Sequence, residues 1–141
     1  MLKDFKTTII TGGIGTGKTH FIKKYINEVI DEENVLLYLV DPKMVELFEY
    51  KNRNNVIYLN TCDEFTKTVY SQVVNQNINK KVYIFIDEAS EMVINETCKK
   101  QIKFLLKNKA KFNCELVLSS QLKTSFCQGM RKNAKTIINL N

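Results

Sequence analysis

The residues best suited to chemistry form a glycine-rich run near the start of the chain. Gly12 to Thr19 reads GGIGTGKT, which fits the pattern G-x-x-x-x-G-K-[ST]. Such a loop folds into a cradle of inward-pointing backbone N–H groups that binds phosphate. Lys18 would reach the β- and γ-phosphates, and the Thr19 hydroxyl would ligate Mg²⁺. The predicted nucleotide contacts are Gly12, Gly13, Ile14, Gly15, Thr16, Gly17, Lys18, Thr19 and the adjoining His20.

The sequence on either side of this run supports the same interpretation. Thr7 to Thr11 is rich in β-branched residues and predicts a buried strand before the loop. Apolar residues recur at helical spacing from Lys18 to about Asp31, so a helix should begin within the loop and direct its positive end at the phosphates. The alternative is a flexible glycine-rich turn, and the strand and helix around it favour a site for ATP.

A pair of acids follows a second apolar run. Val82 to Ile86 predicts a strand, and Asp87 and Glu88 come directly after it. In an ATP-hydrolysing site Asp87 would hold Mg²⁺ through its water shell, and Glu88 would orient and deprotonate the attacking water. The alternative is a surface Asp-Glu pair after a core strand. We expect the pair to lie beside the phosphate loop because the two strands should share one sheet.

A third run, Leu116 to Gln121, predicts a strand that ends in polar residues. Its end places Gln121 or Ser120 where either could sense the γ-phosphate or the attacking water. The predicted catalytic residues are therefore Glu88, Gln121 and Lys18, with Thr19 and Asp87 on the metal.

The chain alternates strands with helices, which predicts an α/β fold with a mainly parallel sheet covered on both faces. Its 141 residues suffice for one domain, 1–141. Further strands are expected at 35–40, 56–59, 115–119 and 136–140. Helices are expected from Pro42 to Phe48, after the capping box of Thr61 to Glu64, and from about Asn95 to Lys109, with a turn or short helix at 125–132.

Composition limits the other possibilities. The four cysteines include no C-x-x-C pair and the only histidine is His20, so neither zinc nor disulfides are expected. The longest apolar run, Val35 to Val40, is far too short for a membrane span, and the first residues do not resemble a signal peptide. A cytoplasmic protein with no membrane segment of its own is the expectation.

Charge is distributed unevenly along the chain. Residues 1–97 contain 11 Lys and Arg against 14 Asp and Glu, whereas residues 98–141 contain 10 against the single acid Glu115. A strongly basic third favours an acidic partner, nucleic acid first, although a solvated lysine-rich surface is the alternative. The predicted DNA contacts are Lys100, Lys103, Lys107, Lys123, Arg131 and Lys132.

Several segments together resemble the FtsK/SpoIIIE family of DNA-translocating ATPases. Asp41 to Leu47 reads DPKMVEL and is similar to the family's DPK-M-x-EL element. Ile84 to Ala89 is similar to its second nucleotide motif, and Cys114 to Gln121 is similar to its HLVLATQ strand. Gly129 to Asn133 lies where the family has G-x-I-[KR]-x-N.

The resemblance implies a RecA-like P-loop NTPase of the ASCE type, a three-layer sandwich with strand order 5-1-4-3-2. It also implies ATP hydrolysis coupled to movement of double-stranded DNA, usually by a ring of six subunits. Gln121-Leu122-Lys123 replaces the usual Gln-Arg-Pro, and Ile137 stands where the family has an arginine. No companion domain, anchor or winged-helix tail is recognisable, so a minimal motor core is the expectation.

Arginine is scarce, since Arg53 and Arg131 are the only two. An arginine supplied in trans speeds such hydrolysis by about 10³–10⁵, and Arg131 is the predicted candidate. The leading hypothesis is a DNA-stimulated ATPase that handles DNA, serving plasmid transfer or viral genome packaging. The alternatives are a non-motor ATP-binding accessory or switch subunit, a filamentous-phage assembly ATPase and a small-molecule kinase.

Overall fold

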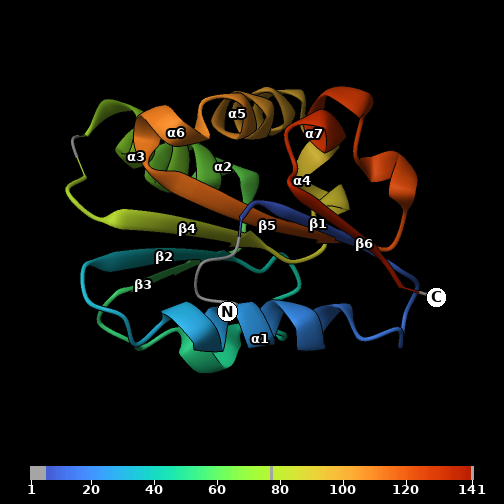
Figure 1. Ribbon diagram of the computed structural model, residues 1–141, viewed down its shortest axis with the longest axis horizontal. Helices are drawn as coiled ribbons and strands as arrows, with labels where there is room; N and C mark the ends of the chain where they lie inside the picture. The colour runs from blue at the N-terminus through green and yellow to red at the C-terminus, as the bar shows by residue number, and fades with distance from the viewer. Residues whose placement is uncertain (1–5, 77, 141) are drawn as a thin grey trace.

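The computed structural model describes residues 6–76 and 78–140, and they form a sheet of six parallel strands with helices on both faces (Figure 1). The strand order is β3-β2-β4-β5-β1-β6, and every pairing is parallel. The strands are β1 (Thr8–Thr11), β2 (Val35–Val40), β3 (Val56–Leu59), β4 (Lys81–Ile86), β5 (Cys114–Ser120) and β6 (Thr136–Asn139).

This sheet confirms the predicted α/β fold and the order of its central strands. Counted without β3, the order β6-β1-β5-β4-β2 is the predicted 5-1-4-3-2, and β3 adds one strand at the edge beside β2. β5 lies between β1 and β4. The strand that leads into Gln121 therefore lies between the strands that lead into the phosphate loop and into Asp87.

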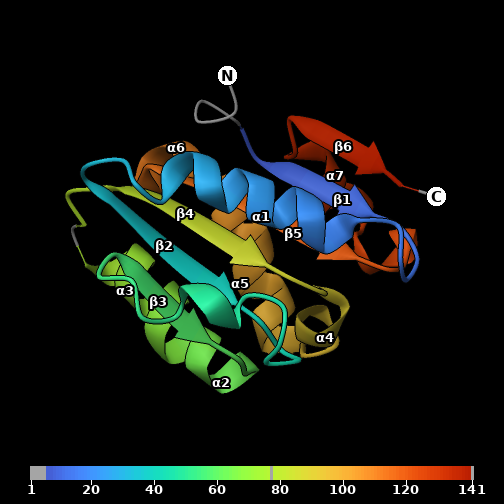
Figure 2. The ribbon, with the colours of Figure 1, turned by 90° about the horizontal axis from the view of Figure 1, so that it is seen from below.

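Alternating side chains of the strands build two separate cores. On one face Ile10, Leu39 and Phe85 pack with α1 (Lys18–Val29) and with the segment 41–50. On the other face Ile9, Ile84 and Leu116 pack with the remaining helices. Figure 2 shows α1 lying across the first face. Because successive strand residues point to opposite faces, both layers depend on the same strands.

The second face is covered by α2 (Cys62–Glu64), the π-helical η3 (Phe65–Tyr70), α3 (Ser71–Asn75), α4 (Ser90–Val93), α5 (Glu96–Lys107), α6 (Lys109–Phe112) and α7 (Gln128–Lys132). The predicted capping box is confirmed, since the Thr61 hydroxyl accepts from the backbone N–H of Glu64 and the Glu64 side chain accepts from that of Thr61. No helix in the described part of the chain combines the length and apolarity of a membrane span.

The predicted helix from Pro42 to Phe48 is wrong. Turns occupy this segment, followed by the 3₁₀ turn η2 (Phe48–Tyr50). The backbone N–H of Leu47 donates to the buried carboxylate of Asp41 at 3.0 Å. In a helix this N–H would donate to a backbone carbonyl instead. Met44 has a φ of 60°, which a right-handed helix cannot contain.

The predicted helix from Asn95 to Lys109 is correct in position but forms two helices. α5 ends at Lys107, α6 begins at Lys109, and Asn108 between them has a φ of −113°. Its side-chain amide donates to the carbonyl of Phe104, which satisfies the end of α5. The short helix α4 was not predicted, because four residues are too few to show helical periodicity.

Candidate nucleotide site

The glycine-rich loop connects β1 to α1 and has the backbone geometry that its sequence predicts. Gly15 and Gly17 have φ values of 80° and 96°, in the left-handed region that favours glycine. A Cβ on Gly12 would lie 2.5 Å from the Thr16 hydroxyl and 2.7 Å from the carbonyl oxygen of Leu140, so no larger residue fits there. The Lys18 ammonium donates to the carbonyls of Gly12 and Gly13 at 2.7 and 3.3 Å.

A cavity of about 230 Å³ lies at the carboxyl ends of β1, β4 and β5. It is lined by Ile14, Gly15, Lys18, Thr19, Lys43, Glu46, Asp87, Glu88 and Gln121. The structure thus brings together residues from all three segments that the sequence singled out. His20 does not line this cavity; it is exposed on α1, beside a different hollow that Lys23 and Asn27 also line.

Asp87 is buried at the end of β4, with 5% of its surface exposed. Its Oδ1 accepts a hydrogen bond from the Ser119 hydroxyl at 2.9 Å. Burial raises the pKa of Asp87, the Ser119 hydrogen bond opposes that rise, and the negative charges of Asp41, Glu46 and Glu88 add to it. Several carboxylates therefore crowd this end of the cavity, which favours a cation there.

The oxygen donors on the cavity wall fit Mg²⁺. The Thr19 hydroxyl and the Asp87 carboxylate face one cavity, and Mg²⁺ is usually held by one or two side chains together with substrate phosphates and water. In residues 6–76 and 78–140 no group of three or more His, Cys, Asp or Glu residues could hold a metal alone. The four cysteines are free thiols.

Glu88 is held in an unusual backbone conformation and by a dense set of donors. Its φ is 55°, and its backbone N–H donates to the Ser119 hydroxyl at 3.1 Å. Its carboxylate oxygen Oε2 accepts from the Ser90 hydroxyl at 2.7 Å, and from the Ser120 hydroxyl and the Gln121 backbone N–H, both at 3.2 Å. A non-glycine residue in the left-handed region is uncommon and costs backbone free energy, so the contacts around Glu88 must hold it there.

Two residues of the cavity wall, Lys43 and Glu46, were not assigned a role from the sequence. They belong to the segment 41–50, which Asp41 anchors by accepting from Leu47 and from the Tyr58 hydroxyl at 2.8 Å. The DPK-M-x-EL pattern marked this segment, but nothing in it showed which side chains face the nucleotide. Because a helix was predicted for this segment, the sequence did not indicate that Lys43 and Glu46 would line the cavity.

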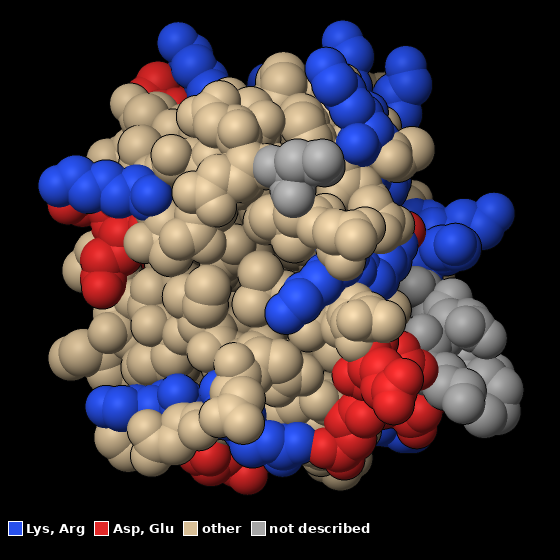
Figure 3. Space-filling view, turned by 90° about the vertical axis from the view of Figure 1, so that its left-hand side faces the viewer, with Lys and Arg blue, Asp and Glu red and all other residues tan. Residues whose placement is uncertain are grey.

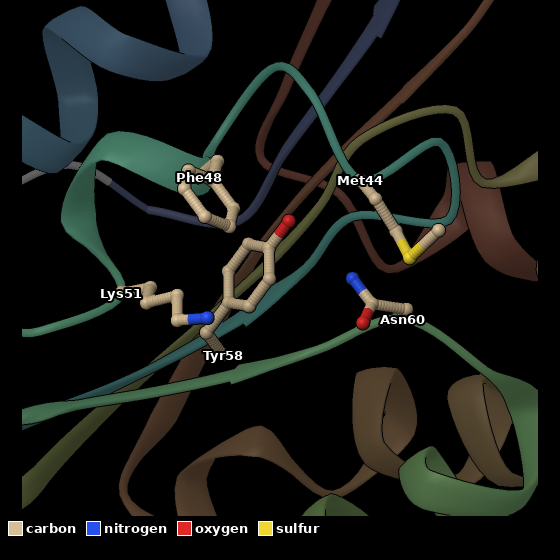
Figure 4. A pocket seen from close by; sticks show the side chains of 5 residues that line it. All are labelled: Met44, Phe48, Lys51, Tyr58 and Asn60. Atoms are coloured by element: carbon tan, nitrogen blue, oxygen red, sulfur yellow. The ribbon is translucent and has the colours of Figure 1, made fainter.

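The same segment also lines a second hollow, of about 340 Å³ (Figure 4). It is lined by Met44, Phe48, Lys51, Tyr58 and Asn60. The rings of Phe48 and Tyr58 meet edge to face at 5.9 Å. The segment 41–50 therefore contributes side chains to both hollows, Lys43 and Glu46 to the nucleotide cavity and Met44 and Phe48 to the second hollow.

Neither arginine lines the nucleotide cavity. The Arg131 guanidinium donates to the backbone carbonyls of Lys123 and Phe126, at 2.7 and 3.1 Å, and so holds α7 against the segment after β5. Arg53 forms an ion pair with Asp31. These two bonds use Nε and one Nη of Arg131 within its own chain.

The helices α5, α6 and α7, which carry most of the basic residues of the last third, lie on the same face of the sheet (Figure 1). Lys100, Lys103 and Lys107 are exposed along α5, and Lys132 is exposed on the adjacent α7. Lys123 is exposed on the connection after β5. Figure 3 shows the end of the molecule away from the phosphate loop, with basic side chains along the upper edge and the largest acidic group in the lower half.

Solved structures share this fold at low sequence identity. Thermomonospora curvata EccC (ATPases 2 and 3), in complex with a signal sequence peptide, matches with a TM-score of 0.75 and 17% identity over 95% of this chain and 31% of that one. The pCW3 conjugation coupling protein TcpA, with ATPγS, has a TM-score of 0.77 and 17% identity, covering 95% and 48%.

A viral enzyme matches over more of its own length. The genome packaging NTPase B204 from Sulfolobus turreted icosahedral virus 2, in complex with AMPPCP, has a TM-score of 0.69 and 17% identity over 95% of this chain and 74% of that one. The chain spans about a third of the EccC structure and half of TcpA. At these identities the likeness shows the fold.

No curated protein matches the sequence. A protein family described as AAA domain matches residues 4–134, which is most of the chain. This match does not identify the FtsK/SpoIIIE family, so that resemblance stays a prediction. With the phosphate loop, the acidic pair and the parallel sheet in place around one cavity, the match over residues 4–134 shows that the chain belongs to the AAA domain family.

Proposed function

We propose that this chain binds Mg²⁺-ATP at the cavity between the phosphate loop and Asp87 and hydrolyses it. The observation that carries the proposal is that one cavity is lined by Lys18, Thr19, Asp87, Glu88 and Gln121. Lys18 and the loop amides bind the phosphates, and Thr19 and Asp87 hold the metal, which neutralises charge on the phosphates. Glu88 orients the attacking water and accepts its proton, and Gln121 contacts the γ-phosphate or that water.

Loss of the Lys18 ammonium should abolish nucleotide binding. In a Lys18→Ala variant we expect the Kd for an ATP analogue to rise by about 100-fold or more, since a buried charge-assisted phosphate contact is lost. Isothermal titration in Mg²⁺ buffer measures this. Lys24→Ala is the matched control, because Lys24 is an exposed lysine of the same helix that does not line this cavity. Equal affinity in both variants would refute the assigned site.

The process that consumes the ATP is, in this proposal, the handling of double-stranded DNA by a ring of subunits. The exposed lysines of α5 and α7 lie on one face, and phosphate contacts from such a face bind DNA without reading its sequence. Structures of similar fold include a conjugation coupling protein and a genome packaging NTPase. The DPK-M-x-EL pattern supports the same class.

A second candidate is an ATP-binding accessory or switch subunit that does not move DNA. It is favoured by the arginines, since the chain has only two and both make contacts within the chain. Turnover measured alone and then with duplex DNA separates the two. Stimulation by DNA supports the motor, whereas unchanged slow turnover supports the switch.

A further inference from the structure

Three serine hydroxyls are connected by hydrogen bonds to the Glu88 carboxylate, two of them directly and the third through one of these two. The Ser90 and Ser120 hydroxyls both donate to Oε2 of Glu88, at 2.7 and 3.2 Å. The Ser125 hydroxyl lies 2.7 Å from that of Ser120. Ser120 is fully buried, whereas Ser90 and Ser125 are half-buried.

The direction of these hydrogen bonds follows from the number of protons available. A serine hydroxyl donates one hydrogen and accepts two. Because the Ser120 proton goes to Glu88, its oxygen accepts from the backbone N–H of Leu122 at 3.2 Å and from the Ser125 hydroxyl. Ser120 is thus fully bonded, and its orientation depends on where the residues after β5 lie.

All the donors to Glu88 converge on one oxygen. The hydroxyls of Ser90 and Ser120 and the backbone N–H of Gln121 donate to Oε2, whereas no described residue donates to Oε1. A carboxylate held by one oxygen has a fixed orientation and keeps its second oxygen available as a base. Since misplacement of a reacting group by about 1 Å can cost 10²-fold in rate, this arrangement has a direct consequence for hydrolysis.

We propose that Ser90 and Ser120 are positioning residues for Glu88, and that Ser125 links this pair to the segment 122–125, whose first three residues are exposed. That segment is held from the other side by Arg131, through the carbonyls of Lys123 and Phe126. Movement of the segment would turn Ser120 and change the placement of Glu88. The proposal rests on hydrolysis at the proposed ATP site and adds the residues that set its rate.

The test is the steady-state kinetics of single and double serine variants. We expect Ser90→Ala and Ser120→Ala each to lower kcat about 10-fold, and the double variant about 100-fold, with KM for ATP nearly unchanged. Ser125→Ala should have a smaller effect in the same direction. Ser90→Thr keeps a hydroxyl at a half-buried position and should retain the activity. Thr124→Ala removes an exposed hydroxyl from the same segment and is the control.

A merely structural role is distinguished by two readouts. In a Glu88→Gln background the serine substitutions should have no further effect on turnover, because they act through the lost carboxylate. Ser90 variants also keep the test valid if the buried Ser120→Ala variant fails to fold. The proposal would be overturned if Ser90→Ala and Ser120→Ala both kept the wild-type kcat. It would also be overturned if Ser90→Thr lost as much activity as Ser90→Ala.

Failure of the proposed hydrolysis is a separate result. If the wild-type protein binds ATP but releases no phosphate, the proposed ATPase activity is wrong, and the positioning of Glu88 is then judged by crystallography. A structure of the Ser90→Ala, Ser120→Ala double variant should show the Glu88 carboxylate moved away from the Gln121 backbone N–H. An unmoved carboxylate would overturn the serine assignment by itself.

Discussion

The surroundings of Asp87 disfavour the ionised form of its carboxyl group. It is buried, and Asp41, Glu46 and Glu88 add negative charge around it, so its pKa is raised in the folded protein. A carboxyl group whose pKa is higher in the folded than in the unfolded state loses stability as pH rises through its titration range. Above that range the ionised Asp87 destabilises the metal-free fold, and Mg²⁺ would relieve this.

Asp87→Asn should therefore stabilise the metal-free protein at pH 7. Asparagine keeps an acceptor for the Ser119 hydroxyl and removes the charge, so we expect a gain on the order of 1 kcal/mol, or about 2–4 °C in Tm. Thermal unfolding in EDTA measures it, and the gain should shrink as pH falls because Asp87 then becomes neutral.

The control for this variant is Glu91→Gln, which removes an exposed acid near the same site. Its Tm should stay within about 1 °C of the wild type, since surface substitutions have small effects. A lower Tm for Asp87→Asn than for the wild type would show that the ionised carboxylate of Asp87 does not destabilise the metal-free fold. Phosphate release by Asp87→Asn should also lose its response to added Mg²⁺.

At the residue scale, the sequence predicted the motif residues of the site but not their supports. Fixed spacing identified Lys18 and Thr19, and an apolar strand followed by two acids identified Asp87 and Glu88. Ser90 was missed because its contact with Glu88 forms within a turn in which Glu88 has a left-handed φ. Spacing along the chain does not encode such a turn.

Among the elements, the strands were predictable and the segment 41–50 was not. β2 and β4 carry nearly continuous apolar runs, as expected for a parallel sheet buried on both faces, whereas β1 and β6 have only two apolar residues each. The segment 41–50 contains helix-compatible residues, and Pro42 suits a first helical turn. A tertiary contact overrides that preference, since buried Asp41 binds the backbone of Leu47 and the hydroxyl of Tyr58.

Glu115 connects three strands of the sheet at the end away from the nucleotide. Its Oε1 accepts from the backbone N–H and the hydroxyl of Thr7, at 2.9 and 2.8 Å, and its Oε2 lies 3.6 Å from the Lys81 ammonium. Glu115→Ala would leave the buried Thr7 donors without their acceptor, so we expect a loss of about 2–3 kcal/mol.

A matched variant separates the hydrogen bonds of Glu115 from its charge. Glu115→Gln keeps an acceptor oxygen for Thr7 and removes the charge, and should lose about 1 kcal/mol or less because the ion pair is partly exposed. Urea unfolding of both variants measures the difference. If Glu115→Gln were as unstable as Glu115→Ala, the charge rather than the Thr7 contacts would hold the strands together.

For the whole molecule, the sheet divides two surfaces of different charge. α1 and the segment 41–50 cover one face with acids and bases mixed, and the exposed lysines of α5 to α7 lie on part of the other face, beside exposed acids of α2 and α4. The sequence showed the excess of positive charge in residues 98–141. It could not show that α5 and α7 are neighbours, because that contact depends on the strand order.

The lysine face should give duplex DNA binding that depends steeply on salt. Replacing Lys100, Lys103 and Lys107 with Gln should reduce the slope of log K against log salt by about 3. Fluorescence anisotropy across a salt series measures this. A control with Gln at Lys23, Lys24 and Lys51, on the α1 side, should keep the wild-type slope. A wild-type affinity that does not vary with salt would contradict the DNA proposal.

The most direct test of the central claim is phosphate release at saturating Mg²⁺-ATP by the wild-type protein and by Glu88→Gln, with ATP affinity measured on the same samples. The wild-type protein should turn over ATP continuously. Glu88→Gln should bind ATP as tightly and release phosphate at least about 100-fold more slowly, since its general base is lost. Equal turnover by the two proteins would contradict the assignment of Glu88 and the hydrolytic site built around it.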